Sequence, residues 1–159
     1  MPMSASKLFL SGMIFLTLTG LSAADERKAV FDLRSGDPDK IEVRLVSDIK
    51  HIADHYKKRD IEFKAVVVIS GRAYKYFIED LDNSPYKDEE GLVEAQSKLR
   101  PIFRELNDDY GVTFEMCEVG MSDRNIKAES LYSYVKSDKL QAIYLIDWQN
   151  AGYAYVPVN

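Results

Sequence analysis

Runs of apolar and β-branched residues recur along the chain at the spacing of short strands. Residues 64–70 (KAVVVIS) form a run without polar alternation, which is typical of a strand covered on both faces. Shorter apolar runs in the rest of the chain predict further strands over residues 28–33, 112–119, 141–147 and 153–156. Strands of these lengths predict a single central sheet.

The segment after the first of these runs has the period of a helix. Asp37 can cap it, and Pro38 fits its first position. Its apolar positions follow at three- and four-residue spacing and form one stripe, which consists of Ile41, Leu45, Ile49, Ile52 and Tyr56. This stripe predicts that the helix packs on the sheet with one face.

Three later segments also have helical spacing. Residues 74–81 predict a short helix, and residues 131–135 predict the last helix before the fourth strand. A longer pattern covers residues 84–106, and Pro101 within it is expected to kink or split the helix.

The alternation of strands and helices predicts an α/β fold with right-handed crossovers between parallel strands. We expect a three-layer α/β/α sandwich around a mostly parallel five-stranded sheet. Asn150-Ala151-Gly152 join the last two predicted strands, and this short link predicts a hairpin. The C-terminal strand is therefore expected to run antiparallel.

The N-terminus has the order of regions found in a secretory signal. Lys7 is the only charged residue before Asp25, and an apolar stretch over residues 8–21 leads to the small residues Ser22-Ala23-Ala24. We therefore predict a signal peptide over residues 1–24 and one domain over residues 25–159. The mature protein would be periplasmic or secreted, without a membrane segment. An uncleaved N-terminal anchor is the alternative.

Charge and composition narrow the choice of partners. The chain has 159 residues, 30% of them charged, and a formal net charge of −5. Nucleic-acid binding requires a basic face, so this balance argues against a nucleic-acid partner.

Candidate chemistry gathers where the predicted strands end, since ligands of open α/β sheets bind outside the carboxyl ends of the strands. The residues that we expect to bind a ligand there are Gly71, Arg72, Gly120, Arg124 and Trp148. Other interpretations are open: the glycines fit tight turns, the arginines fit solvated surface charges, and Trp148 fits a subunit interface. His51 and His55 have a spacing that can hold a metal, but the pattern around them supplies no further ligand.

Cys117 is the only cysteine of the chain and lies near the end of the third predicted strand. One interpretation is a small buried residue without chemistry, since free cysteine is among the most buried residue types. The other is a reactive thiol, with its thiolate favoured by nearby arginines. Nothing in the pattern around it is typical of a cysteine hydrolase.

Taken together, the order and spacing of several segments resemble the DsrE/DsrF-like family, which has the YchN-like fold. The segments that carry this resemblance are FDL at 31–33 with SGD at 35–37, VVVISG at 66–71, FEMC at 114–117 with VGM at 119–121, and LIDWQ at 145–149 with GYAY at 152–155. They extend over nearly the whole predicted mature region.

The resemblance implies an α/β/α sandwich that assembles as a homotrimer or homohexamer. In sulfur-relay members it also implies a cysteine that carries sulfane sulfur as a persulfide, and Cys117 resembles that cysteine. The partners would then be a sulfane-sulfur donor and an acceptor thiol, on a protein or a small molecule, and no cofactor is needed. The alternative function is an oligomeric small-ligand-binding module in which Cys117 is structural.

Overall fold

A five-stranded sheet forms the centre of the protein. The computed structural model describes residues 25–159, so the predicted signal peptide lies outside the described residues. From one edge to the other, the strands are β4 (Val135–Lys139), β3 (Thr113–Cys117), β2 (Glu62–Ile69), β1 (Glu26–Leu33) and β5 (Ala154–Val158). Every neighbouring pair is parallel.

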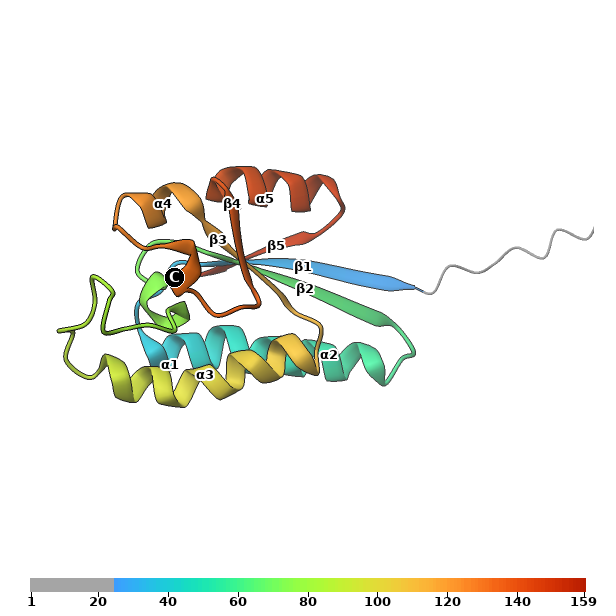
Figure 1. Ribbon diagram of the computed structural model, residues 1–159. Helices are drawn as coiled ribbons and strands as arrows, with labels where there is room; N and C mark the ends of the chain where they lie inside the picture. Colours follow the sequence, from blue (N-terminus) through green and yellow to red (C-terminus); the bar gives the residue numbers. More distant parts are fainter. Residues whose placement is uncertain (1–24) are drawn as a thin grey trace, which may run out of the picture.

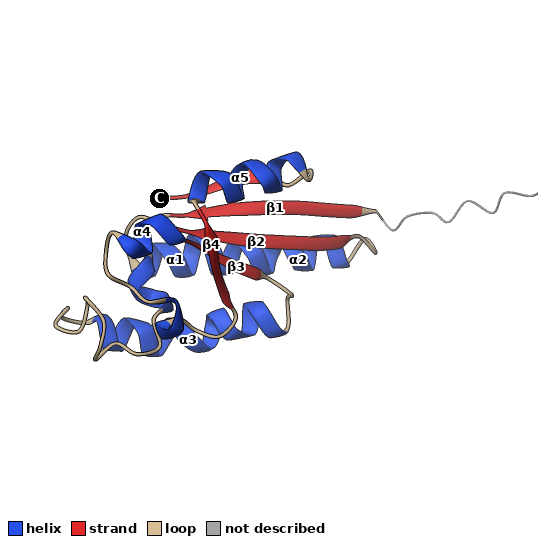
Figure 2. Ribbon diagram, turned by 45° about the horizontal axis from the view of Figure 1, so that its top comes forward, coloured by secondary structure: helices blue, strands red, loops and turns tan. Residues whose placement is uncertain are grey.

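Helices cover both faces of this sheet (Figure 1). One face carries α1 (Pro38–Ile41), the π-helical η1 (Glu42–Ser47), α2 (Asp48–Lys57) and α3 (Leu92–Asp108). The opposite face carries α4 (Glu118–Ser122) and α5 (Gln141–Asn150). Two short 3-10 segments, η2 (Tyr74–Phe77) and η3 (Ala128–Ser130), lie in the connections. The predicted three-layer α/β/α sandwich is therefore confirmed, and Figure 2 shows the layers from a second direction.

The first helical segment begins as its sequence predicts. The Asp37 carboxylate accepts hydrogen bonds from the backbone N–H groups of Asp39 and Lys40, and Pro38 occupies the first turn. The apolar stripe then continues through α1, η1 and α2, with Ile41 and Ile49 fully buried. This capped stripe fixes the helical layer on one face of the sheet.

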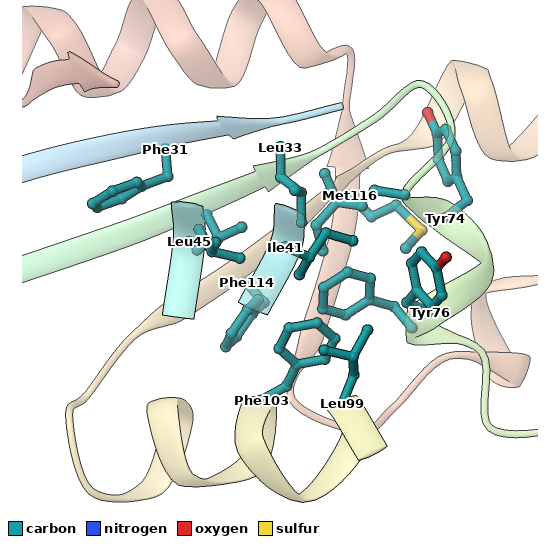
Figure 3. Packing of buried hydrophobic residues seen from close by; sticks show 14 of the residues in the cluster. Phe31, Leu33, Ile41, Leu45, Tyr74, Tyr76, Leu99, Phe103, Phe114 and Met116 are labelled. Carbon is teal, nitrogen blue, oxygen red and sulfur yellow. The ribbon is translucent and has the colours of Figure 1, made fainter. Parts of the chain in front are cut away.

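The main core lies between the sheet and α1, α2 and α3 (Figure 3). Phe77, Phe103 and Phe114 meet at its centre, and the rings of Phe77 and Phe103 stack with centroids 4.5 Å apart. A smaller core on the opposite face packs Tyr144 and Leu145 of α5 against valines of β1 and β2.

The fourth predicted strand was wrong. Residues 141–147 begin α5, and the fourth strand is β4, which includes the end of the segment 131–135 that was predicted as a helix. A short run that is apolar on all sides cannot be assigned to helix or strand by period alone. The sequence of β4, VKSDK, is polar because this strand lies at an edge of the sheet.

The predicted antiparallel direction of the last strand was also wrong. Because α5 is a helix, the chain returns along it and enters β5 in the same direction as β1. The turn at residues 151–152 thus joins a helix to a strand, and all five strands are parallel.

The third helix differs from its prediction at its start. The pattern over residues 84–106 predicted a helix from Ser84, but α3 begins only at Leu92, after Gly91 with a φ of 74°. Pro101 does not split it, and α3 continues through this residue as one helix of 17 residues. Among the helices that the structure describes, none combines the length and the apolar character needed to cross a membrane.

The phenylalanine cluster gives a stability prediction. Phe103→Ala should lower the free energy of unfolding by about 3–5 kcal/mol, because it removes a fully buried ring and leaves a cavity. Val93→Ala on the same helix is the control, since Val93 is 69% exposed and should change stability by less than about 0.5 kcal/mol. Urea unfolding measures both. Equal effects of the two variants would contradict this account of the core.

Candidate functional site

The ends of β2 and β3 are neighbours, yet the chain leaves them towards opposite faces of the sheet. After β2 the chain passes through η2 to α3, whereas after β3 it turns directly into α4 on the α5 side (Figure 1). In open α/β sheets, ligands bind beside strand ends where the connections diverge in this way. The residues at this point form the candidate site.

Cys117 is the last residue of β3 and the N-cap residue of α4. Its thiol is free, and the residue is only 5% exposed. The sequence therefore placed Cys117 correctly at the carboxyl edge of the sheet. In the single chain, however, the surrounding side chains cover it.

Tyr74, at the start of η2, places its hydroxyl group beside Cys117. We call Cys117 and the residues around it, Tyr74, Gly120 and Arg124, the corner. The Tyr74 hydroxyl donates a hydrogen bond to the backbone oxygen of Cys117 at 3.3 Å, and the residue is 1% exposed. Burial, together with the neighbouring Cys117 thiol, raises the pKa of Tyr74 well above its usual value. Tyr74 thus stays protonated at neutral pH and remains a hydrogen-bond donor beside Cys117.

Arg124 covers the other side of the tyrosine ring. Its guanidinium carbon lies 4.8 Å from the ring centroid of Tyr74, and its Nη1 donates to the backbone oxygen of Gly120 at 2.9 Å. A Cβ atom at Gly120 would collide with the Tyr74 hydroxyl. Glycine at this position is therefore what allows α4, Tyr74 and Arg124 to close around Cys117.

Gly71 and Arg72 lie at the adjacent strand end but do not join this corner. Gly71 has a φ of 64°, and a Cβ there would approach the backbone oxygen of Arg34 to 3.0 Å. The backbone N–H of Arg72 donates to that same oxygen at 3.1 Å, which ties the loops after β1 and β2 together. The Arg72 side chain is exposed. Gly71 therefore forms a tight turn, which was the alternative interpretation of this residue.

Trp148 lies elsewhere, because residues 147–149 end α5 rather than a strand. Its Nε1 donates to Glu115 Oε2 at 2.6 Å, and its ring packs edge-on against Tyr153, with centroids 4.7 Å apart. Tyr153 precedes β5, so Trp148 points towards the amino ends of the strands. The placement of Trp148 at the carboxyl edge was therefore wrong, although it does bind a buried carboxylate.

Asp32 of β1 is a second buried acid on the face of the sheet that α5 covers. It is 0% exposed and accepts hydrogen bonds from Arg34 Nε at 2.9 Å, Gln141 Nε2 at 2.5 Å and the Tyr155 hydroxyl at 2.8 Å. These donors come from the loop after β1, from α5 and from β5. The carboxylate therefore joins three segments near the strand ends.

A pocket opens beside the corner, between the loop after η2 and the loop after α4. Its volume is about 360 Å³, and its lining includes Asp80, Ser84, Asn125 and Lys127. Asn125 directly follows Arg124, so the pocket adjoins the candidate site. Charges of both signs in its wall suit a small polar molecule.

The sequence matches the model of a known protein family. The model of the DsrE/DsrF-like family matches residues 28–158, which is most of the chain. The chain belongs to the DsrE/DsrF-like family. This confirms the resemblance that the sequence segments indicated.

Two relatives illustrate how far the DsrE/DsrF-like assignment extends. An uncharacterized protein of Aquifex aeolicus (strain VF5) is 31% identical over 144 residues, which cover 91% of this chain but 61% of that protein. The chain thus spans about three fifths of its relative. The structure of a protein of unknown function, MTH1491 from Methanobacterium thermoautotrophicum, matches with a TM-score of 0.64 at 16% identity, over 82% of this chain and 98% of that one. That likeness shows the fold alone.

Three residues of this DsrE/DsrF-like chain were not predicted as parts of the site. Tyr74 was interpreted only as an apolar position of a short helix, and Asp32 and Glu115 were passed over within apolar strands. The available signal was the acid itself: a carboxylate between two large apolar residues, as in FDL and FEM, must find a donor when the strand is buried.

The contact between Gly120 and Tyr74 is testable by a pair of substitutions. Gly120→Ala should lower the free energy of unfolding by about 1–3 kcal/mol, the usual cost of overpacking. Tyr74→Phe removes the hydroxyl that the new Cβ meets, so it should recover part of this loss. Recovery stays partial because the ring carbon Cζ would still lie 2.7 Å from that Cβ. Strict additivity of the two substitutions in urea unfolding would refute the contact.

Glu115 predicts a pH dependence, because burial raises its pKa. The folded state then holds the proton more tightly than the unfolded state, so stability falls as the pH rises from the unfolded-state value, about 4.3, through the folded-state value. Glu115→Gln keeps an acceptor for Trp148 Nε1 and removes the charge. The variant should be more stable than the wild type at pH 7, and this advantage should vanish near pH 4. Thermal unfolding at both pH values measures it, and a pH-independent difference would contradict it.

Proposed function

We propose that this protein is a sulfur carrier that accepts a sulfane sulfur atom on Cys117 and passes it to an acceptor thiol. The position of Cys117, at a diverging strand end with Tyr74 and Arg124 beside it, is the observation that carries the proposal. Membership of the DsrE/DsrF-like family supports the proposal, because the resemblance implies that sulfur-relay members carry sulfane sulfur on a cysteine that Cys117 resembles.

The transfer requires no change in the number of electrons. The Cys117 thiolate attacks the terminal sulfur of a donor persulfide, RS–SH, and forms a new S–S bond. The donor S–S bond breaks, its electron pair leaves with RS⁻, and the proton stays on the transferred sulfur. An acceptor thiolate then attacks that outer sulfur and releases Cys117 as thiolate. This is the in-line displacement of thiol–disulfide exchange.

The neighbouring side chains suit the two charge states of this cycle. Arg124 brings a permanent positive charge to the corner, which suits an anionic donor. Tyr74 remains protonated, so its hydroxyl can donate a hydrogen bond to sulfur when the local geometry shifts. No metal or organic cofactor takes part in these steps.

Access to Cys117 requires a local movement, because the residue is 5% exposed. Helix α4 is the segment whose displacement would expose the thiol, since it has only five residues and follows Cys117 directly. Short segments with few buried contacts open at a low free-energy cost. Only Met121 of α4 is buried.

Because a signal peptide is predicted, the proposal includes a carrier that works in the periplasm or outside the cell. Its donors there would be persulfides, polysulfides or thiosulfate-derived sulfur, and its acceptor would be a protein or small-molecule thiol. We include in the proposal the homotrimer or homohexamer that the resemblance implies.

A second function is favoured by one observation, the burial of Cys117. In a non-catalytic binding module, the thiol would fill space in the core, and a small ligand would occupy the strand-end region. The two functions differ in whether native Cys117 reacts.

Intact mass spectrometry distinguishes the two functions. After incubation with a small-molecule persulfide, the carrier should gain one sulfur atom that reduction removes, and Cys117→Ser should gain none. Arg124→Gln should slow the uptake about tenfold, which is the rate equivalent of ~1.4 kcal/mol lost from the interaction with an anionic donor. Arg44→Gln, an exposed arginine on the opposite face, is the control and should leave the rate unchanged.

Alkylation provides the second measurement. A carrier opens often enough for a small alkylating reagent to label native Cys117 within the time of sulfur uptake. A thiol labelled only after unfolding, with no sulfur adduct from several donors, would rule out the carrier and support the binding module.

A further inference from the structure

The pocket beside the corner is formed by two loops that the backbone holds together. One wall is the loop after η2, and the other is the loop after α4. Where the two loops meet, the Glu79 N–H donates to the backbone oxygen of Ser130 at 2.7 Å, beside an antiparallel bridge between Ile78 and Leu131. The pocket is therefore preformed, and a ligand does not have to order its walls.

The size and lining of the pocket favour a small polar ligand. Its volume of about 360 Å³ lies at the lower end of the range for small-molecule sites. Among the described residues that line it, none is aromatic, so the walls offer no ring for stacking a base or another planar group. Ile126 supplies a buried apolar side chain, and Asn83 and Asn125 supply amide groups.

Three charged side chains in the pocket wall lack a charged partner. Within residues 25–159, Asp80, Lys127 and Glu129 form no ion pair with another side chain. Glu79, directly before Asp80, does pair, with Arg100. Two acids repel a simple anion, and the lysine repels a simple cation. A zwitterion instead brings a partner of opposite charge to all three side chains.

The charged residues lie on turns that hold them in place. Asp80 Oδ1 accepts from the Asn83 N–H at 3.2 Å, and its Oδ2 accepts from Asn83 Nδ2 at 2.8 Å. An ionised carboxylate can accept about four hydrogen bonds, so Asp80 retains room for a ligand. In the other wall, the backbone oxygen of Lys127 accepts from the N–H of Ser130 at 3.1 Å and from its Oγ at 2.7 Å. The acids and the base are therefore positioned before a ligand arrives.

Both walls of the pocket continue into the corner. In one wall, Asn125 directly follows Arg124. In the other, Ser84 Oγ accepts from the Tyr86 N–H at 3.1 Å. The Tyr86 side chain lies near Arg124: burial raises the pKa of Tyr86, and the guanidinium opposes this increase. A ligand in the pocket therefore lies on the Arg124 side of the corner.

We propose that the pocket binds a small α-amino acid, whose ammonium group pairs with Asp80 and Glu129 and whose carboxylate pairs with Lys127. A second step rests on the proposed function: the sulfur donor is the persulfide of a free amino acid. The pocket then holds the zwitterionic end of the donor, and its terminal sulfur points towards Cys117.

Calorimetry with an unreactive analogue tests the binding. S-methyl-L-cysteine carries both charges but no transferable sulfur, so it should bind the wild type and Cys117→Ser with equal affinity. S-methylcysteamine lacks the carboxylate, and S-methylmercaptopropionate lacks the ammonium group. Each of these two probes should bind about tenfold more weakly or less, because one charged group of the pocket then has no partner.

Substitutions in the walls locate the binding site. Lys127→Gln and Asp80→Asn should each weaken the binding of S-methyl-L-cysteine about tenfold, since each removes one charge-assisted contact. Lys58→Gln, at an exposed lysine between α2 and β2, is the matched control and should leave the affinity unchanged. Circular dichroism verifies that every variant is folded. Three results would overturn the proposal: no saturable binding, equal affinity for the three probes, or an equal loss of affinity in Lys58→Gln.

Sulfur uptake separates this inference from the carrier function. With cysteine persulfide as donor, Lys127→Gln should slow uptake on Cys117 about tenfold, whereas with inorganic polysulfide, which has no zwitterionic end, it should leave the rate unchanged. If the chain binds S-methyl-L-cysteine but takes up sulfur from neither donor, the carrier function fails and the amino-acid site stands. If it takes up sulfur from both donors at rates that Lys127→Gln does not change, the carrier function stands and the donor role of the pocket fails.

Discussion

The charge of Asp32 constrains how this chain can fold. A carboxylate that is 0% exposed costs several kcal/mol unless it is paired and hydrogen-bonded. Its donors are Arg34, Gln141 and Tyr155, and the last two arrive only when α5 and β5 are in place. The buried acid of β1, the first strand in the sequence, thus receives two of its hydrogen-bond donors from α5 and β5, the last two elements of the chain. This requirement couples the return of the chain along α5 to the formation of the sheet centre.

The same constraint makes the two faces of the sheet chemically different. Asp32 and Glu115 both pair in register with Val68, so the two acids lie in one row across the sheet, separated by one strand. Both find donors on the α5 side, whereas the opposite face meets α1, α2 and α3 through a cluster that consists mainly of aliphatic and aromatic side chains and contains no carboxylate. The apolar face supplies most of the burial, and the α5 face supplies polar contacts that require one particular arrangement.

This difference explains what the sequence could and could not predict. Strands β1, β2 and β3 and the capped helix at Pro38 were predictable because two-sided burial and one-sided stripes leave clear periods. Helix α5 was not, since its outward isoleucines remove the period that identifies an amphipathic helix. Once residues 141–147 were interpreted as a strand, the direction of β5 was necessarily wrong as well.

For the candidate site, the position of each residue along the chain relative to a strand end could be predicted from the sequence, but the direction of its side chain could not. Cys117, Gly120 and Arg124 come together because they follow one strand end, whereas Tyr74 reaches them from another connection, and no local pattern encodes that contact. Trp148 was misplaced together with α5.

On the proposed function, the burial of Cys117 and an oxidising compartment are compatible. An exposed thiol there would be oxidised or captured in mixed disulfides, and a chain with one cysteine cannot protect it in an internal disulfide. In the proposed carrier, cover by Tyr74, Arg124 and α4 would limit reaction to the times when the corner opens. A persulfide formed on Cys117 would be sheltered in the same way until an acceptor thiol arrives. For a carrier of this kind, the cover over the thiol is therefore a functional element, and Gly120 is the residue that lets it close.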